Sequence, residues 1–294
     1  MTPSGREGDV GGGVTSLFAG VDIGSTTSKA VLIDRAGTVV AFSIIDTKHD
    51  RNQSGEEVLA MALEAAGRDE ADLVMIATTG YGRRSFTRSQ KVMPEIICHA
   101  LGTEHLYPGV KTLIDVGGQD SKVIAMGEGG TVEMFEMNDR CAAGTGRFFE
   151  VLSRRLLSVP LDELGPLALT SKNPVYLSSV CTIFAESEII SYLSEGLPAA
   201  DIAMGILEAM AKRVVAIGRQ ARIPYEEPIV LTGGIALNVA AKKAFEDQLD
   251  KEVVVLDQPQ MPAALGIALV GRDEADMSED AGPSGPQEPG SDVT

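Results

Sequence analysis

Two short segments of the sequence combine an aspartate, glycines and small polar side chains in the same order. DIGSTTSK begins at Asp22 and DVGGQDSK begins at Asp115, and at an offset of 93 residues they match at Asp, Gly, Ser and Lys. Glycine lets backbone N–H groups approach a phosphate chain closely, and hydroxyl or amide side chains add donors without adding negative charge. An aspartate just before each turn could hold Mg²⁺ through water. The pair of segments predicts a nucleotide-phosphate site, whereas either segment alone is typical of an ordinary tight turn.

A third glycine-rich turn extends this prediction. LTGGIA, residues 231–236, repeats the arrangement of strand end and turn in ATTGYG, residues 77–82. The sequence contains neither GxGxxG nor GxxxxGK followed by Ser or Thr, so Rossmann and P-loop nucleotide sites have no support. Gln119 is the candidate for orienting the water that attacks a phosphate. The predicted nucleotide-binding residues are Gly24, Ser25, Thr26, Thr27, Lys29, Gly117, Gly118, Gly233 and Gly234, and the predicted residues for phosphate chemistry are Asp22, Asp115 and Gln119.

The cysteines could also carry chemistry. Cys98, Cys141 and Cys181 are widely spaced in an apparently intracellular chain, in which lasting disulfides are rare. They are either buried small hydrophobic residues or functional thiols. Cys141 and Cys181 each precede a predicted helix, whose positive end would stabilise a thiolate. Cys98 has no second signal, and we expect it to be a packed core thiol.

The three histidines give weaker evidence for a functional site than the cysteines do. His99 follows Cys98, but neighbouring residues on a helix point about 100° apart and seldom share a metal ion. His49 and His105 have no partner at ligand spacing, and both are expected at the surface or in loops.

The elements that must position these residues can be predicted from periodicity. Alternating β-branched residues predict three strands across 17–24, 25–34 and 38–44, and Ser54 with Glu57 predicts a capping box at the start of a helix. Pro94 is expected to start the helix PEIICHALG. Further helices are predicted at 147–157, 181–195, 199–218, 235–249 and 262–271, and further strands at 72–82, 228–234 and 252–257.

Because the opening pattern recurs, the predicted fold is α/β with two similar lobes. We expect a first lobe at 17–106, completed by the closing helix 262–271, and a second lobe at 107–261. Residues 1–16 and 272–294 have the glycine-rich and acidic compositions of disordered tails, and the latter carries a net charge of −6.

Composition excludes several classes of function. The net charge of −17 argues against a nucleic-acid binder, and no apolar run approaches the roughly 20 residues of a membrane-spanning helix. The N-terminus lacks the basic and then apolar layout of a signal peptide, so a cytoplasmic protein is expected.

Longer motifs carry a specific resemblance. DIGSTTSKAVLID, IDVGGQDSK and VLTGGIALN resemble the two phosphate segments and the adenosine segment of the actin, Hsp70 and sugar-kinase superfamily, whose two ribonuclease-H-like lobes close around ATP. NDRCAAGTGRF (138–148), VCTIFAESEII (180–190) and PQMPAALGIAL (259–269) resemble a narrower group. That group contains the ATP-dependent activators of 2-hydroxyacyl-CoA dehydratases and the ATPase subunits of benzoyl-CoA reductase. The resemblance covers about residues 18–271.

The resemblance implies an ATPase that passes a low-potential electron to a partner enzyme acting on a CoA thioester. Its cofactors would be ATP, Mg²⁺ and one [4Fe–4S] cluster. Two thiolates per chain cannot complete such a cluster, but a two-fold axis doubles them, so Cys141 and Cys181 would supply half the ligands from each subunit. The implied partners are a second copy in a homodimer, or a related subunit in a heterodimer, a dehydratase or reductase component, and a ferredoxin or flavodoxin donor.

The sequence also allows other interpretations. A small-molecule kinase of the same superfamily could use Asp120 as its base, and an ATP-switched scaffold like actin would need no redox group. The carboxylates of Glu186 and Glu188 could lie near the nucleotide or form a polar helix face. The basic stretch RRSFTR, residues 83–88, could contact a partner, although a solvated loop is the simpler interpretation.

Overall fold

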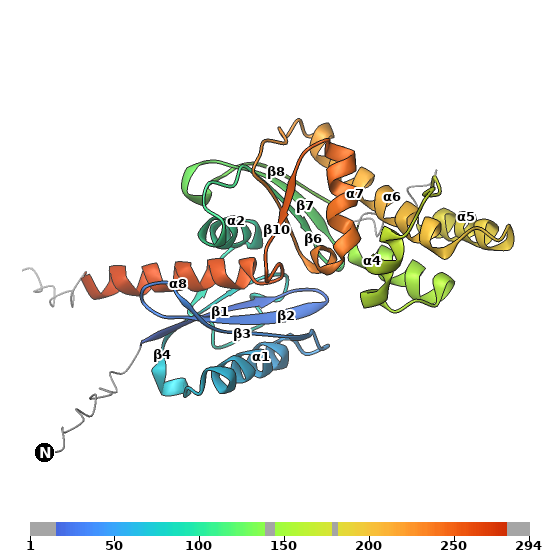
Figure 1. Cartoon of the computed structure of the whole chain (residues 1–294). Helices are drawn as coiled ribbons and strands as arrows, with labels where there is room; N and C mark the ends of the chain where they lie inside the picture. The colour runs from blue at the N-terminus through green and yellow to red at the C-terminus, as the bar shows by residue number, and fades with distance from the viewer. Residues whose placement is uncertain (1–15, 139–144, 178–181, 281–294) are drawn as a thin grey trace, which may run out of the picture.

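Two five-stranded mixed sheets form the framework of the molecule. The computed structural model describes residues 16–138, 145–177 and 182–280 (Figure 1). The first sheet has the order β3-β2-β1-β4-β5 and contains β1 (Leu17–Ile23), β2 (Thr27–Ile33), β3 (Val39–Asp46), β4 (Leu73–Thr79) and β5 (Lys91–Val92). The second has the order β10-β9-β6-β7-β8 and contains β6 (Thr112–Val116), β7 (Ser121–Met126), β8 (Val132–Asn138), β9 (Ile229–Thr232) and β10 (Val253–Val255).

The two sheets repeat one topology. In the first, β1 pairs antiparallel with β2 and parallel with β4; in the second, β6 pairs antiparallel with β7 and parallel with β9. Both sheets therefore open with a strand, a glycine turn and an antiparallel strand. The predicted two-lobed α/β fold is confirmed.

Helices and sheets alternate in layers (Figure 1). Successive residues of a strand point to opposite faces of a sheet. Accordingly, Val21 of β1 packs with Val58 of α1 (Arg51–Ala66) on one face, while Phe18 packs with Ala268 of α8 (Pro262–Asp280) on the other. The second sheet is covered in the same way, by α2 (Glu95–Leu106) on one face and by α6 (Ala199–Gln220) and α7 (Val239–Leu249) on the other.

The middle layer consists of α2 and α8, which cross at glycines. A Cβ atom on Gly102 of α2 would lie 1.9 Å from the carbonyl oxygen of Pro262, and one on Gly266 of α8 would lie 1.8 Å from that of Cys98. The helix backbones are therefore in direct contact, and α2 and α8 together separate the two sheets.

The remaining helices extend the second half of the chain. They are α3 (Gly146–Leu152), a π-helical turn (Ser153–Leu157), α4 (Leu161–Leu169) and α5 (Thr182–Ser194). Short 3₁₀ turns lie at Glu70–Asp72, Glu128–Gly130 and Gly234–Leu237. Among the described residues, no helix is both long enough and apolar enough to span a membrane.

Two helix ends differ from the sequence prediction. The N-cap of α1 is Asp50, whose side chain accepts from the Gln53 amide, and Ser54 is buried within the helix instead of capping it. The closing helix, predicted to end at residue 271, continues to Asp280. Arg35 pairs with Asp276 and Glu279, so contacts to a distant strand end hold an acidic segment that was expected to be disordered.

Candidate functional site

The turns that follow β1 and β6 have equivalent geometry and face each other. The amide of Gly24 donates to the carbonyl of Thr27 at 3.1 Å, and the amide of Gly117 donates to the carbonyl of Asp120 at 3.0 Å. A Cβ atom on Gly118 would lie 2.1 Å from Oγ1 of Thr26. The turn from the second sheet therefore lies directly against the turn from the first.

A cavity of about 120 Å³ lies between these turns. All nine residues predicted to bind nucleotide line it, as do the two predicted aspartates. Gln119 is exposed at the tip of its turn and does not line the cavity. The full lining comprises Asp22, Gly24, Ser25, Thr26, Thr27, Lys29, Tyr81, Glu95, His99, Asp115, Gly117, Gly118, Asp120, Gly233, Gly234 and Gln260.

A second, mostly apolar cavity of about 330 Å³ shares Gly234 with the first. Its lining includes Phe149 of α3, Pro166 of α4 and Ile235 in the predicted adenosine segment. A cavity lined by glycine turns and polar side chains, next to an apolar one, is suited to a ligand with a phosphate chain at one end and a flat ring at the other.

In the first lobe, one lysine pairs with one aspartate. Asp22 and Lys29 are opposite each other across the β1–β2 ladder, and Nζ of Lys29 donates to Oδ2 of Asp22 at 3.0 Å. Burial raises the pKa of the Asp22 carboxyl, although Lys29 opposes that shift. The other oxygen, Oδ1, is buried and has no hydrogen-bond partner among the described residues. Oδ1 lies against Gly80, where a Cβ atom would be 2.4 Å away, so Asp22 lines the cavity with one buried oxygen left unsatisfied.

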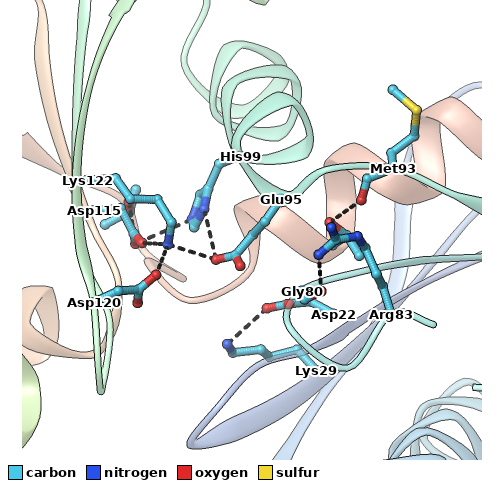
Figure 2. A network of polar contacts seen from close by, with 12 residues as sticks. Asp22, Lys29, Gly80, Arg83, Met93, Glu95, His99, Asp115, Asp120 and Lys122 are labelled. Carbon is cyan, nitrogen blue, oxygen red and sulfur yellow. Dashed lines mark hydrogen bonds and ion pairs between the residues drawn. The ribbon is translucent and has the colours of Figure 1, made fainter. Parts of the chain in front are cut away.

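In the second lobe, the equivalent lysine is surrounded by three carboxylates (Figure 2). Nζ of Lys122 lies 3.2 Å from Asp115, 2.9 Å from Glu95 and 2.7 Å from Asp120. Burial opposes the charge on Lys122, but the three carboxylates outweigh it and raise the pKa of that ammonium well above its usual value. The side chain of Lys122 is 2% exposed, so this cation is a permanent part of the structure.

The same network separates the pKa values of its acids. Burial disfavours ionised Asp115, but His99 and Lys122 reverse the effect and lower its pKa to about 2. Burial likewise opposes ionisation of Glu95, and again Lys122 and His99 lower the pKa. At Asp120 burial prevails and the pKa is raised. Glu95 and Asp115 are thus the carboxylates that this environment keeps charged.

Four residues that line the cavity were missed by the sequence analysis: Tyr81, Glu95, His99 and Gln260. Glu95 and His99 lie one helical turn apart at the start of α2, and Nε2 of His99 approaches Oδ1 of Asp115 at 3.4 Å. Their i, i+4 spacing after Pro94 was the available signal, because it places both side chains on one helix face. The prediction considered His99 only beside Cys98.

The carboxylates and His99 could also be considered for a metal. Ligand atoms of Glu95, His99 and Asp115 lie within 4.8 Å of one another. The Lys122 ammonium contacts two of the three, so its charge already occupies that space. Asp22 lines the cavity outside this three-residue group and is the better candidate to hold hydrated Mg²⁺, which accepts carboxylate oxygens and keeps several waters.

The cysteines fall into two groups. Cys98 is fully buried, and burial raises its thiol pKa to about 12, which agrees with the predicted core thiol. Cys141 and Cys181 lie outside the described residues. The described helices nearby begin at Gly146 (α3) and at Thr182 (α5), so α5 starts at the residue that follows Cys181.

The other singled-out side chains do not line either cavity. Glu186 and Glu188 lie on α5, partly buried. In the basic stretch, Arg83 donates to the carbonyl of Gly80, and Arg88 pairs with Glu56 and Glu70. His105 contacts the carbonyl oxygen of Gly37, and His49 is exposed. The arginines of residues 83–88 that make these contacts therefore serve the fold of the first lobe.

The fold defines a broad class. A ROK family glucokinase from Streptomyces griseus, solved with glucose and AMPPNP, shares it with a TM-score of 0.54 at 14% identity, covering 88% of this chain and 100% of the kinase. Two lobes with a cavity at their paired turns give the molecule the two-lobed fold of the actin, Hsp70 and sugar-kinase class. More narrowly, residues 19–271 match the BadF/BadG/BcrA/BcrD ATPase family, and the chain belongs to that family.

Its relatives have defined roles. The chain is 39% identical to a 2-hydroxyisocaproyl-CoA dehydratase activator from Clostridioides difficile, covering 88% of this chain and 96% of the relative. It is 39% identical to the (R)-2-hydroxyglutaryl-CoA dehydratase activating ATPase of Acidaminococcus fermentans, covering 85% and 95%. A benzoyl-CoA reductase subunit from Thauera aromatica is 31% identical, covering 87% and 93%.

A solved structure agrees with these matches. The activator of the 2-hydroxyisocaproyl-CoA dehydratase from Clostridium difficile, with bound ADPNP, superposes with a TM-score of 0.85 at 38% identity, covering 90% of this chain and 97% of that one. The chain is therefore an ATPase of a family whose named members include dehydratase activators.

Proposed function

We propose that this ATPase activates a 2-hydroxyacyl-CoA dehydratase by delivering a low-potential electron to it. The observation that carries the proposal is the 39% identity to two dehydratase activators across nearly the whole of each relative. The cavity supports it, because every residue predicted to bind the nucleotide lines one space between the lobes.

The phosphate chain would be held by backbone donors of the two opposed turns and by Lys29. The Lys29 side chain is 14% exposed and lines the cavity, so it can reach a phosphate oxygen, whereas Lys122 is committed to three carboxylates. Asp22, which lines the cavity, would hold hydrated Mg²⁺, which offsets the charge of the phosphates when it is bound. An acidic chain can thereby bind ATP without a basic surface.

Nucleotide binding would be coupled to movement of the lobes. The turns of Thr26 and Gly118 come from different sheets and touch across the cavity, so a ligand between them changes the distance between the lobes. The backbone contact of α2 with α8 at Gly102 and Gly266 supplies a crossing about which the sheets can rotate. Rotation of the two sheets about this crossing would be a hinge motion between packed elements.

The redox group of the proposal is a [4Fe–4S] cluster shared by two copies of the chain, with Cys141 and Cys181 as the ligands from each. The cluster would store and release one electron at low potential. The support for these ligands is the family resemblance of their two motifs. Thr182 begins α5 next to Cys181, where the helix dipole favours a thiolate.

A dehydratase assay tests the activity. Anaerobically purified protein, reduced by ferredoxin or flavodoxin, should activate the dehydratase that one of the related activators serves when ATP is present. It should not do so when ATP is replaced by a non-hydrolysable analogue. Formation of a phosphorylated small molecule without dehydratase activation would instead support the sugar-kinase alternative, in which Asp120 would be the base.

The second candidate is an ATPase subunit of benzoyl-CoA reductase, favoured by the 31% identity to the reductase subunit from Thauera aromatica. It predicts pairing with a related subunit. Purified alone, this chain would then be monomeric and fail to hold iron, whereas a dehydratase activator would be a homodimer. Size-exclusion chromatography with light scattering under anaerobic conditions separates the two.

A further inference from the structure

The polar and the apolar cavity meet at one residue of the third glycine turn. Gly234 lines both the cavity between the turns that follow β1 and β6 and the mostly apolar cavity next to it. A nucleoside triphosphate carries its sugar between the phosphate chain and the base. With the phosphates in the first cavity and the ring in the second, the ribose lies beside Gly234.

The side chain that approaches this junction belongs to Gln260. Its Nε2 lies 3.5 Å from the position that a Cβ atom of Gly234 would take. Apart from the chain neighbours of Gly234, no other atom of the described residues lies within 4 Å of that position. Gln260 also lines the first cavity. Its amide is therefore at the wall that the two cavities share.

The backbone of the turn before α8 holds Gln260 in this place. The carbonyl of Pro259 accepts from the amide of Gly233 at 2.8 Å, and the carbonyl of Gln258 accepts from the amide of Met261 at 3.1 Å. Pro259 is also buried. The residues on both sides of Gln260 are thus tied to the glycine turn and to the start of the helix, which fixes where its side chain begins.

The amide of Gln260 is uncommitted. The side chain is partly buried and forms no hydrogen bond with another residue in the described ranges. A side-chain amide offers an acceptor and two donors on one planar group. Two adjacent hydroxyl groups, each of which can donate and accept, match both kinds of atom, whereas a phosphate oxygen can use only the donors.

Polar side chains elsewhere in the two cavities have other positions or partners. Ser25, Thr26 and Lys29 lie on the β1–β2 hairpin, at the phosphate end. In the second cavity, Oδ1 of Asn238 accepts a hydrogen bond as the N-cap of α7. Gln260 differs from them because it lies at the junction with both its donor and its acceptor uncommitted.

From this geometry we infer that Gln260 is a specificity-determining residue that recognises the ribose of ATP. Oε1 accepts from one of the vicinal 2′ and 3′ hydroxyls, and Nε2 donates to the other. The protein therefore prefers ribonucleotides to deoxynucleotides. The inference rests on the nucleotide binding of the proposed function and is independent of its iron–sulfur part.

The test combines a change in the protein with a change in the ligand. Isothermal titration calorimetry of the full chain with Mg²⁺ measures the affinity for ADP, 2′-deoxyADP and 3′-deoxyADP. The wild type should bind each deoxynucleotide about 2- to 10-fold more weakly than ADP, as expected for one lost hydrogen bond. Gln260→Met keeps the length of the side chain and removes the amide. It should weaken ADP more than either deoxynucleotide and bind all three equally.

A matched control comes from the same turn. Gln258 is exposed, lies two residues earlier and lines neither of these two cavities. Gln258→Met should therefore discriminate between the nucleotides as the wild type does. If Gln260→Met proves unstable, Gln260→Asn gives the same test, since the shorter amide withdraws from the hydroxyls.

Two outcomes would overturn the inference. One is equal affinity of the wild type for the three nucleotides. The other is discrimination that persists in Gln260→Met, because the substitution would then weaken all three nucleotides alike and the amide would lie at a phosphate. Wild-type protein that binds none of the three would contradict the nucleotide site of the proposed function itself.

Discussion

The two hairpins that form the cavity share a backbone geometry but differ in the number of carboxylates around their lysines. Residues 22–29 and 115–122 share the strand pairing and the turn hydrogen bond. In the first hairpin, Lys29 pairs with Asp22 and still reaches the cavity; in the second, Lys122 is enclosed by three carboxylates. Of the two equivalent lysines, Lys29 can therefore contact a ligand in the cavity, whereas Lys122 stabilises the folded structure.

Substitution of the two lysines should give the largest difference in the free energy of unfolding. Lys122→Met leaves three buried acids without their cation and is expected to lower the free energy of unfolding by about 3–5 kcal/mol. Lys29→Met leaves one buried carboxylate, Asp22, without its partner and should cost about 1–3 kcal/mol, but it should weaken ATP binding directly. Urea unfolding of the nucleotide-free protein measures the change in stability, and titration with a non-hydrolysable ATP analogue measures the change in affinity. Equal destabilisation by the two substitutions would contradict the asymmetry.

The aspartates should differ in the sign of their pH dependence. Because the pKa of Asp115 is lowered to about 2, its ionised form stabilises the fold by about 2 kcal/mol above about pH 4, and this is lost as the pH falls through about 2. Asp115→Asn should therefore lower stability at pH 6 and flatten the acid slope.

Asp22 provides the matched comparison. Burial raises its pKa, so the ionised carboxylate is unfavourable in the folded protein above that pKa and becomes less so as the pH falls. Asp22→Asn should leave stability at pH 6 unchanged or increased. Unfolding free energies measured from pH 2 to pH 6 for both variants and the wild type test this difference, and parallel losses in the two variants would refute it.

The turn tips provide the next test. Gly118 occupies the position equivalent to Ser25, and a side chain there would collide with Thr26 of the opposite turn. Gly118→Ala is expected to cost about 1–3 kcal/mol through overpacking and to weaken analogue binding. Ser25→Ala adds no atoms and should change stability by less than about 0.5 kcal/mol. A Gly118→Ala variant of wild-type stability would show that the turns are not in contact.

The smallest expected difference is at the serines. Oγ of Ser28 shares a hydrogen bond of 2.8 Å with Thr47, whereas Oγ of Ser121 is buried without a partner in the described part of the chain. Ser28→Ala should cost about 1 kcal/mol, and Ser121→Ala should be neutral or stabilising. Thermal unfolding compares them, and a larger loss for Ser121→Ala would reverse the interpretation.

The sequence predicted the part of this arrangement that is local. The repeat of Asp, Gly, Ser and Lys identifies both hairpins, and the equivalent glycine turns correctly place their residues at one cavity. Which lysine is enclosed could not be predicted, because Glu95 reaches Lys122 from a helix far away in the chain. The helical end of α8 was missed for the same reason, since its acids pair with Arg35.

Site residues on α2 were missed for a different reason. Cys98 and His99 are adjacent, but one points into the core and the other to the cavity, as neighbouring positions on a helix must. The relevant partner of His99 was Glu95, four residues earlier. Exposure of Gln119 also depends on how the two turns meet, which residue type and spacing do not encode.

The central claim is that an ATPase with this cavity carries half of a shared [4Fe–4S] cluster on Cys141 and Cys181. The direct measurement is iron content and visible absorption of anaerobically purified wild type, Cys141→Ala, Cys181→Ala and Cys98→Ala. We predict about two iron atoms per chain in the wild type and in Cys98→Ala. Either of the other variants should lose the iron and the colour while still binding the ATP analogue. Iron retained in Cys141→Ala or Cys181→Ala, or absent from the wild type, would contradict the account.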